Sequence, residues 1–480
     1  MLSFLSSLAV LILGYFIYGT VVDKIFGSEI QRETPAISQA DGVDYVAMDW
    51  KKAFLIQFLN IAGLGPIFGA IAGALWGPSA FIWIVLGTIF AGGVHDYLSG
   101  MLSIRSNGAS IAEIIGNNLG NKIRQIMRIF SIVLLILVGT VFMTGPALLL
   151  ANLTPDFLGV NSWLIIILGY YFVATFLPVD KIIGKLYPVF GLTLLIMALG
   201  VGGGLIIGNY DIPNIALNNL HPESLPIWPL MFVTIACGAI SGFHSTQSPI
   251  MARCTTNEKE GRRIFYGAMV AEGIVALIWA AAAMTFFQGT GGLGTALVEF
   301  GGPAGVVHEI TGTMMGVIGG LLAMLGVVAA PITSGDTAFR SVRLALSDIF
   351  SLDQKPIKNR LMLAIPIFII GGSLSQINFD VLWRYFAWSN QTMAMVVLWA
   401  GAVWLAKNDK NHWIASIPAF FMTGVSATYI LYAPEGFQLA YNISVPIGIL
   451  TAVSTMLIFL YKISKTDFIE NMQPEQKEAV

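Results

Sequence analysis

Apolar stretches of about twenty residues recur along the whole of this 480-residue chain, and they constrain its fold more than any other feature. Charged residues make up only 11% of the chain, against about 25% in a soluble domain, so most of the surface cannot face water. The sequence therefore predicts an all-α polytopic membrane protein with about 13 transmembrane helices in contact with lipid. The expected helices begin near Leu2, Ala53, Ser79, Ile129, Trp163, Ile183, Trp228, Ile264, Thr311, Leu361, Val381, Trp413 and Ile443.

Basic residues gather on one side of these predicted helices. When loops are assigned to alternate sides, all of the 25 Lys and Arg except Arg384 fall on the side that holds loops 22–52, 105–128 and 253–263. Cytoplasmic loops carry an excess of Lys and Arg. We therefore expect the N-terminus outside and the C-terminus in the cytoplasm of a bacterial-type inner membrane. Residues 1–22 lack a basic start and a small-residue cleavage site, so we interpret them as the first membrane helix.

Two of the predicted helices carry interruptions. One contains Ala62-Gly63-Leu64-Gly65-Pro66, and the other contains Ser241-Gly242-Phe243-His244-Ser245 with Pro249 after it. Proline lacks an amide donor and glycine lowers the cost of unwinding, so both helices should break there. Paired breaks are the best sequence pointer to a transporter site, and half-helix N-termini there would aim amides at a substrate carboxylate. The expected substrate-binding residues are Gly63, Leu64, Gly65, Pro66, Ser241, Gly242, Phe243, His244 and Ser245.

The spacing of the two breaks predicts an internal repeat. They lie an odd number of helices apart, so the second broken helix runs opposite to the first. This pattern indicates two inverted five-helix repeats with discontinuous helices, at 53–226 and 227–410. Residues 1–52 would add one helix and a cytoplasmic loop before the repeats. Residues 411–480 would add two helices and a polar tail after them.

Several polar residues could bind a coupling ion. The imidazole of His244 can titrate near neutral pH, which suits proton coupling, although it could equally bond a freed carbonyl and never titrate. Ala330, Thr333 and Ser334 share one helix face, where one carbonyl and two hydroxyls could hold Na⁺ together with freed carbonyls near Ala62. The alternative is that both hydroxyls bond back to their own helix. Beyond H⁺ or Na⁺ as coupling ion, we expect no cofactor.

Two charged pairs are candidate gates. Asp336 and Arg340 have the i,i+4 spacing of a simple ion pair, and they could also form a gate that opens and closes. His95 and Asp96 could form a gate or a proton relay near the cytoplasm, but adjacent helical residues point apart, so we expect no direct pair. The polar patch at 388–391 would anchor its helix or bond across helices. Cys237 and Cys254 are too few for a disulfide framework or a zinc cluster, and we expect free thiols.

Ordered motifs from residue 34 to about residue 340 resemble the carbon starvation protein A family. The resemblance implies an amino-acid/polyamine/organocation-type transporter fold and proton-driven uptake of peptides or pyruvate during nutrient limitation. The chain is much shorter than the larger members, and Ser245-Thr246-Gln247-Ser248 departs from their pattern after the histidine. The motifs are Thr34-Pro35-Ala36, Asp41-Gly42-Val43-Asp44-Tyr45-Val46, Ala62 to Pro66, Ala91-Gly92-Gly93-Val94-His95-Asp96, Arg105-Ser106-Asn107-Gly108-Ala109-Ser110, Ser241 to His244 and Asp336-Thr337-Ala338.

These features favour an ion-coupled symporter of small molecules over other membrane proteins. A sodium-coupled amino-acid carrier of the same fold is the alternative. A channel would need a polar pore or a filter ring, and the sequence indicates neither. An intramembrane enzyme would need a nucleophile with its base or metal ligands of the H-E-x-x-H kind, so we expect no enzyme. Nothing in the sequence indicates a nucleic-acid partner, and it leaves the oligomeric state open.

Overall fold

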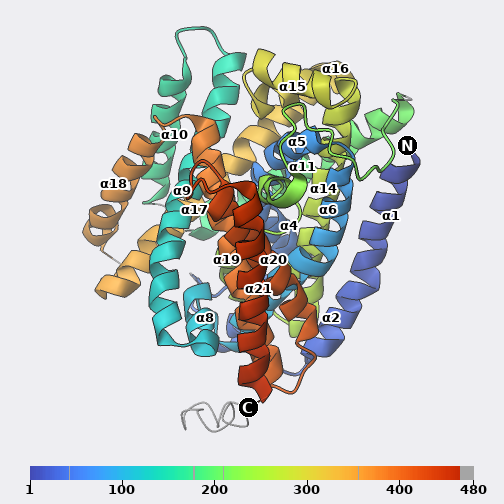
Figure 1. The fold of residues 1–480 in the computed structure, drawn as a ribbon. Helices are drawn as coiled ribbons and strands as arrows, with labels where there is room; N and C mark the ends of the chain where they lie inside the picture. Colours follow the sequence, from blue (N-terminus) through green and yellow to red (C-terminus); the bar gives the residue numbers. More distant parts are fainter. Residues whose placement is uncertain (43, 177–178, 209, 355, 465–480) are drawn as a thin grey trace.

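The computed structural model describes residues 1–480 except 43, 177–178, 209, 355 and 465–480, so Val43 and most of the predicted polar tail lie outside the described residues. The described part folds into helices and loops without a β-strand. The N-terminal helices are α1 (Leu2–Phe16), α2 (Tyr18–Phe26) and the short α3 (Pro35–Ser38). The chain begins at one end of the molecule, and its described part finishes at the opposite end (Figure 1), as an odd number of crossings requires.

The first predicted repeat contains an interrupted helix, four longer helical segments after it and the short α8. Its helices are α4 (Trp50–Ile61), η1 (Gly65–Gly69), α5 (Ala70–Gly73), η2 (Ala74–Trp76), α6 (Ser79–Leu86), η3 (Gly87–Gly92), α7 (Gly93–Arg105), α8 (Ile111–Leu119), α9 (Asn121–Leu153), α10 (Val160–Ala174) and α11 (Val179–Ile207).

The second predicted repeat also starts with an interrupted helix. After this repeat come two long helices, α20 and α21. The helices from 227 to the end are η4 (Ile227–Met231), α12 (Phe232–Thr234), α13 (Gly242–Ala252), η5 (Glu258–Glu260), η6 (Arg262–Tyr266), α14 (Gly267–Phe286), α15 (Thr290–Glu299), α16 (Pro303–Ala323), η7 (Met324–Ala329), α17 (Ala330–Phe350), α18 (Ile357–Leu374), α19 (Phe379–Lys407), α20 (Trp413–Tyr432) and α21 (Tyr441–Ser464).

Both predicted helix breaks are present. The segments Trp50–Ile61 and Gly65–Trp76 meet at a bend of 56°, with Ala62–Leu64 between them outside any helix. In the second broken helix, α12 ends at Thr234 and α13 begins at Gly242. Glycine and proline at both places explain why the chain leaves the helix there.

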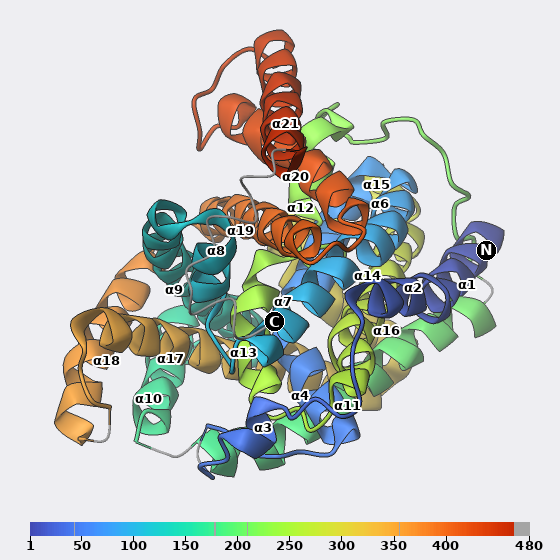
Figure 2. The same cartoon turned by 90° about the horizontal axis from the view of Figure 1, so that it is seen from below.

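The two broken helices lie in the middle of the bundle. From below, α4, α7 and α13 occupy the centre, while α1, α18 and α21 lie at the edge (Figure 2). The apolar windows of α1–α2 and α21 are 28% and 22% buried, whereas that of η5–α14 is 78% buried. Exposed apolar faces at the periphery are what lipid requires of a membrane protein.

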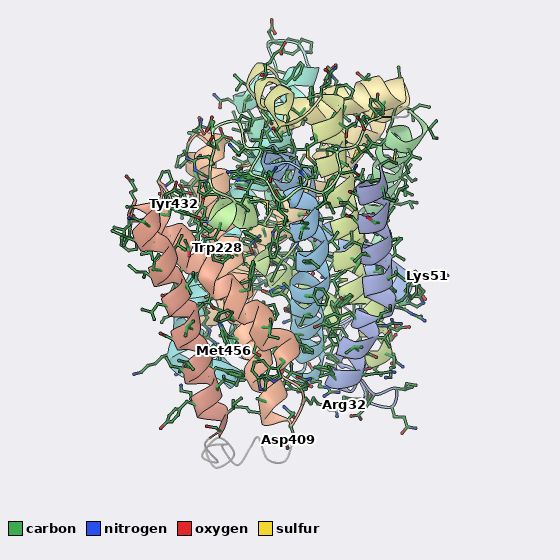
Figure 3. All side chains as sticks on the ribbon, turned by 45° about the vertical axis from the view of Figure 1, so that its right-hand side comes forward. Arg32, Lys51, Trp228, Asp409, Tyr432 and Met456 are labelled. Atoms are coloured by element: carbon green, nitrogen blue, oxygen red, sulfur yellow. The ribbon has the colours of Figure 1, made fainter. Side chains whose placement is uncertain are left out.

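The number of membrane crossings stays a prediction. By length and composition, the described residues contain 8 helices able to span a membrane, or 9 when the bent pair counts as one span. Among the other expected spans, α10 is short, the helix that contains α12 and α13 is interrupted, and α19 is long but lacks a sufficiently apolar window. Arg32 and Asp409 lie at the lower end of the molecule, away from Tyr432 (Figure 3).

Candidate functional site

The two helix breaks pack directly against each other in the core. Gly65 approaches Cys237 so closely that a Cβ at position 65 would lie under 3.0 Å from the Cys237 side chain. Gly238, with φ of +93°, also lies beside Pro66: an added Cβ would lie 3.4 Å from the Pro66 Cα, in ordinary contact, and 2.5 Å from the Ala276 Cβ on α14. The absence of a side chain at Gly65 lets the two broken segments touch, so both predicted breaks contribute to one site.

Neighbouring helices bond the backbone groups that the second break sets free. Trp83 Nε1 donates to the Ile235 carbonyl at 3.2 Å, and Thr88 Oγ1 donates to the Gly238 carbonyl at 2.9 Å. Asn390 Oδ1 on α19 accepts the Phe243 amide at 2.6 Å. A broken helix within a membrane needs such internal partners. The Phe243 amide at the N-terminus of α13 is therefore committed to a side chain of the protein, contrary to our expectation that such amides face a substrate.

Asn390 links the break to the helix that carries the predicted polar patch. Its Nδ2 lies 2.9 Å from Ser241 Oγ and 3.4 Å from Cys237 Sγ, and its side chain is fully buried. Gln391 Nε2 donates to the Phe232 carbonyl at 3.0 Å. Bonding across helices, one of the two roles predicted for this patch, is thus confirmed.

Four titratable side chains form a chain of contacts beside the break, which we name the buried His–carboxylate cluster: His95, Asp96, His244 and Glu272. Asp96 Oδ1 lies 2.7 Å from His95 Nδ1, and Asp96 Oδ2 lies 2.9 Å from His244 Nδ1. His244 Nε2 lies 3.3 Å from Glu272 Oε2, and all four side chains are fully enclosed.

The expectation that His95 and Asp96 do not pair is wrong. Imidazole Nδ1 and a short aspartate carboxylate both lie close to their own backbones, so the two can bend toward each other across one helical step. Asp96 lies in the second half of the continuous span Ser79–Arg105, where it contacts His244.

Glu272 on α14 was missed by the sequence analysis. It is the single charged residue in the apolar run from Gly267 to Phe286. A carboxylate inside a membrane helix is by default a functional candidate, so this signal was present in the sequence. The remaining predicted residues of the break are buried, and Ser245 Oγ donates to the Gly242 carbonyl of its own helix at 2.6 Å.

The predicted sodium ligands lie beside the first broken helix. Thr333 Oγ1 and Ser334 Oγ both donate to the Ala330 carbonyl, at 2.7 and 3.1 Å, as the back-bonding alternative predicted. Ser334 Oγ also lies 3.2 Å from the Leu59 carbonyl, one turn before the break at Ala62. Oxygen atoms from α4 and α17 therefore converge, although Ala62 itself makes no contact with these hydroxyls among the described bonds.

The predicted pair of Asp336 and Arg340 lies beside a cavity on the side that holds the basic loops. Arg340 Nη2 lies 3.5 Å from Asp336 Oδ2, which confirms the ion pair, and it donates to the Ala174 carbonyl at 3.1 Å. The cavity has a volume of about 300 Å³ and lies between α8, α9, α13 and α17. Its charged lining residues are Asp44, Glu113, Arg128, Arg253 and Arg340.

A second ion-pair network ties the N-terminal helix to the repeats at the same end. Glu258 is fully buried and accepts from Arg105 Nε at 3.0 Å and from the Glu29 amide at 2.9 Å. Arg105 Nη2 also donates to the Gly27 carbonyl at 2.7 Å. The end of α2, the end of α7 and the loop after α13 therefore meet at one carboxylate.

Known transporter structures share this architecture. The chain is similar to MhsT in complex with L-phenylalanine, with a TM-score of 0.55 and 15% identity over 83% of this chain and 98% of that one. A manganese transporter of Eremococcus coleocola matches with a TM-score of 0.53 and 14% identity over 89% of this chain and 99% of that one. The chain thus has the fold of these structures, that of a helical membrane protein with discontinuous helices.

The sequence comparisons give the family. The carbon starvation protein CstA family matches residues 1–152, 151–292 and 285–429, and the chain belongs to this family. An uncharacterized membrane protein of Haemophilus influenzae is 45% identical over 60% of this chain and 92% of its own length. Peptide transporter CstA and pyruvate/proton symporter BtsT of Escherichia coli are each 27% identical over 57% of this chain. The chain matches only 48% and 47% of the lengths of these two transporters.

Proposed function

We propose that this protein is a secondary active transporter that takes up peptides or pyruvate-like small carboxylates across the inner membrane during carbon starvation. The observation that carries the proposal is the direct contact of the two helix breaks at Gly65 and Cys237 in the core. Irregular backbone at membrane depth is tolerated where it lines a site, and such paired breaks form transporter sites at the interface of two repeats. The central site would include Gly63 to Pro66 and Ser241 to Ser245.

The charge of the cavity supports an anionic substrate. Arg128, Arg253 and Arg340 line it and outnumber the carboxylates of Asp44 and Glu113. The lining continues along α13 through Thr246 and Pro249, which follow directly on the second break. Arginine matches carboxylates in both charge and geometry. The names of the two Escherichia coli relatives, a peptide transporter and a pyruvate/proton symporter, describe substrates that carry a carboxylate.

Sodium is a second candidate coupling ion beside the proton. The support is the approach of Ser334 Oγ to the Leu59 carbonyl, which brings hydroxyl and carbonyl oxygens of two helices within 3.2 Å. Together with the carbonyls of Ala330 and Ala62, these are the hard oxygen ligands that such a cation takes. Asp336 with Arg340, and His95 with Asp96, remain proposed gates, and N-out orientation remains part of the proposal.

Reconstitution into proteoliposomes tests this function. We expect uptake of labelled pyruvate or dipeptides to saturate with concentration and to accelerate when a proton or sodium gradient is imposed. Unlabelled substrate should compete, and a neutral amide analogue should not. Flux that rises linearly with concentration and ignores both gradients would contradict a carrier and favour a channel.

A further inference from the structure

Three possible metal ligands from different segments converge at the second helix break. Cys237 lies within the break, His244 in the first turn of α13, and Glu272 on α14. One ligand atom from each lies within 4.8 Å of the other two, and all three residues are buried. We propose that Cys237, His244 and Glu272 bind one divalent transition-metal ion of the Zn²⁺ type.

The ligand chemistry selects this class of ion. Thiolate, imidazole and carboxylate bind Zn²⁺ at about 2.0–2.3 Å, which places ligand atoms of a tetrahedral site about 3.3–3.8 Å apart. His244 Nε2 and Glu272 Oε2 already lie 3.3 Å apart. The sulfur ligand disfavours Mg²⁺, Ca²⁺ and Na⁺, which prefer oxygen. Three protein ligands leave a fourth position open for water.

Two of the three proposed ligands present buried atoms without a hydrogen bond, while Cys237 Sγ lies 3.4 Å from both Ser241 Oγ and Asn390 Nδ2. His244 Nε2 and both carboxylate oxygens of Glu272 are enclosed in the protein without a hydrogen bond of normal geometry, and Nε2 faces Oε2 at 3.3 Å. Buried polar atoms are almost always bonded, and the binding of an ion is one of the few explanations for a buried atom without a hydrogen bond. A metal ion between His244 Nε2 and the Glu272 carboxylate would accept electron pairs from both side chains.

The surroundings hold two of the ligands in the orientation that a metal requires. Asp96 Oδ2 lies 2.9 Å from His244 Nδ1. A carboxylate at this position accepts a hydrogen bond from Nδ1–H and leaves the Nε2 lone pair free for the ion. This is the usual arrangement behind a metal-bound histidine. Asn390 Nδ2 donates to Cys237 Sγ at 3.4 Å, which stabilises a thiolate.

The charge of the site also calls for a cation. Asp96 and Glu272 are two enclosed carboxylates, and no Lys or Arg of the described residues forms an ion pair with either. A Cys237 thiolate would add a third negative charge. Buried charges in a membrane are paired or coordinate metals, and a divalent ion supplies the compensation from within the cluster.

Cobalt substitution of the purified full-length protein tests the site. After chelation and exchange, Co²⁺ should bind at one equivalent per chain and give a near-ultraviolet thiolate-to-cobalt absorption band. Cys237→Ser should remove this band, and Glu272→Gln should keep it while lowering Zn²⁺ affinity by about tenfold or more. Cys254→Ser is the matched control, because Cys254 is the other buried thiol and lies outside the cluster. It should behave as the wild type.

Two results from the variants would overturn the proposal, as would the absence of the band in the wild type. One is a thiolate band that survives in Cys237→Ser, and the other is the same Zn²⁺ affinity in wild type and Glu272→Gln. Weak binding without the band in the wild type would mean that protonated imidazoles, rather than a metal, neutralise the cluster. If Cys237→Ser does not purify as a single species, the Glu272→Gln titration decides alone.

Discussion

Asn390 Oδ1 accepts a hydrogen bond from the backbone N–H of Phe243 at 2.6 Å, so α19 caps the half-helix that begins at the second break. This bond joins the last helix of the second repeat to its first. It also fixes the amide orientation of Asn390, because an oxygen must face the Phe243 N–H. The shape of the break therefore depends on a residue 147 positions further along the chain.

Asn390→Ala should destabilise the protein. The Phe243 amide would lose its partner inside the core, and an unsatisfied buried donor costs about 1–3 kcal/mol. Thermal unfolding in detergent should show a clear fall in Tm. Asn408→Ala is the control, since Asn408 ends the same helix and bonds only the Trp404 carbonyl at 2.8 Å. Equal Tm values for the two variants would refute the capping role.

Gly65→Ala should impair transport and lower stability. The new Cβ would overlap Cys237, and overpacking of a tight core costs about 1–3 kcal/mol. Gly169→Ala on α10 offers a control, because nothing lies within 4 Å of its added Cβ. Uptake by both variants is measured in proteoliposomes at equal protein content. Normal uptake by Gly65→Ala would mean that the contact of the two breaks has no part in transport.

Ser334→Ala should abolish any dependence of uptake on sodium. The change removes the hydroxyl that lies between the Ala330 and Leu59 carbonyls. Initial uptake rates at increasing Na⁺ give the measurement. Ser347→Ala serves as control, since Ser347 lies further along α17 and bonds its own helix at Leu344. A wild-type protein that is indifferent to sodium would end this assignment and leave the proton as the coupling ion.

Both breaks could be predicted from the sequence because their cause is local. Glycine and proline disfavour the helix wherever they stand, and the basic residues mark the loops without reference to the fold. The approach of Asp96 to His244 was not predictable in this way, since it depends on how α7 packs against α13. Glu272 was visible as a lone charge, but only the fold places it at His244.

Arg128→Gln should weaken the apparent affinity for carboxylate substrates. Arg128 lines the cavity between α9 and α13, and the loss of one charge contact of about 1.4 kcal/mol raises KM about tenfold. Arg124→Gln is a close control, because Arg124 lies one turn earlier on α9 and bonds Asn121. The ratio of KM values for a carboxylate and its amide analogue is the measurement. An equal ratio in both variants would show that Arg128 does not attract the substrate.

Cysteine labelling should reveal the orientation. Asn107→Cys should react with an impermeant maleimide only in opened cells, and Asn219→Cys should react in intact cells, because both positions are exposed at opposite ends. The two native thiols should not react with the maleimide. Cys237 is buried, and burial raises the pKa of Cys254 to about 11, so the Cys254 thiol is protonated at neutral pH. Labelling of Asn107→Cys in intact cells would reverse the proposed topology.

The shared carboxylate of Glu258 has a mechanical consequence. It holds the end of α2, the end of α7 and the loop after α13 together, and to part them would strand a charge in an enclosed place. We therefore expect the hinge of an inward opening to lie between this junction and the two helix breaks. The N-terminal helices would then move together with α7 and the loop after α13, although they belong to neither repeat.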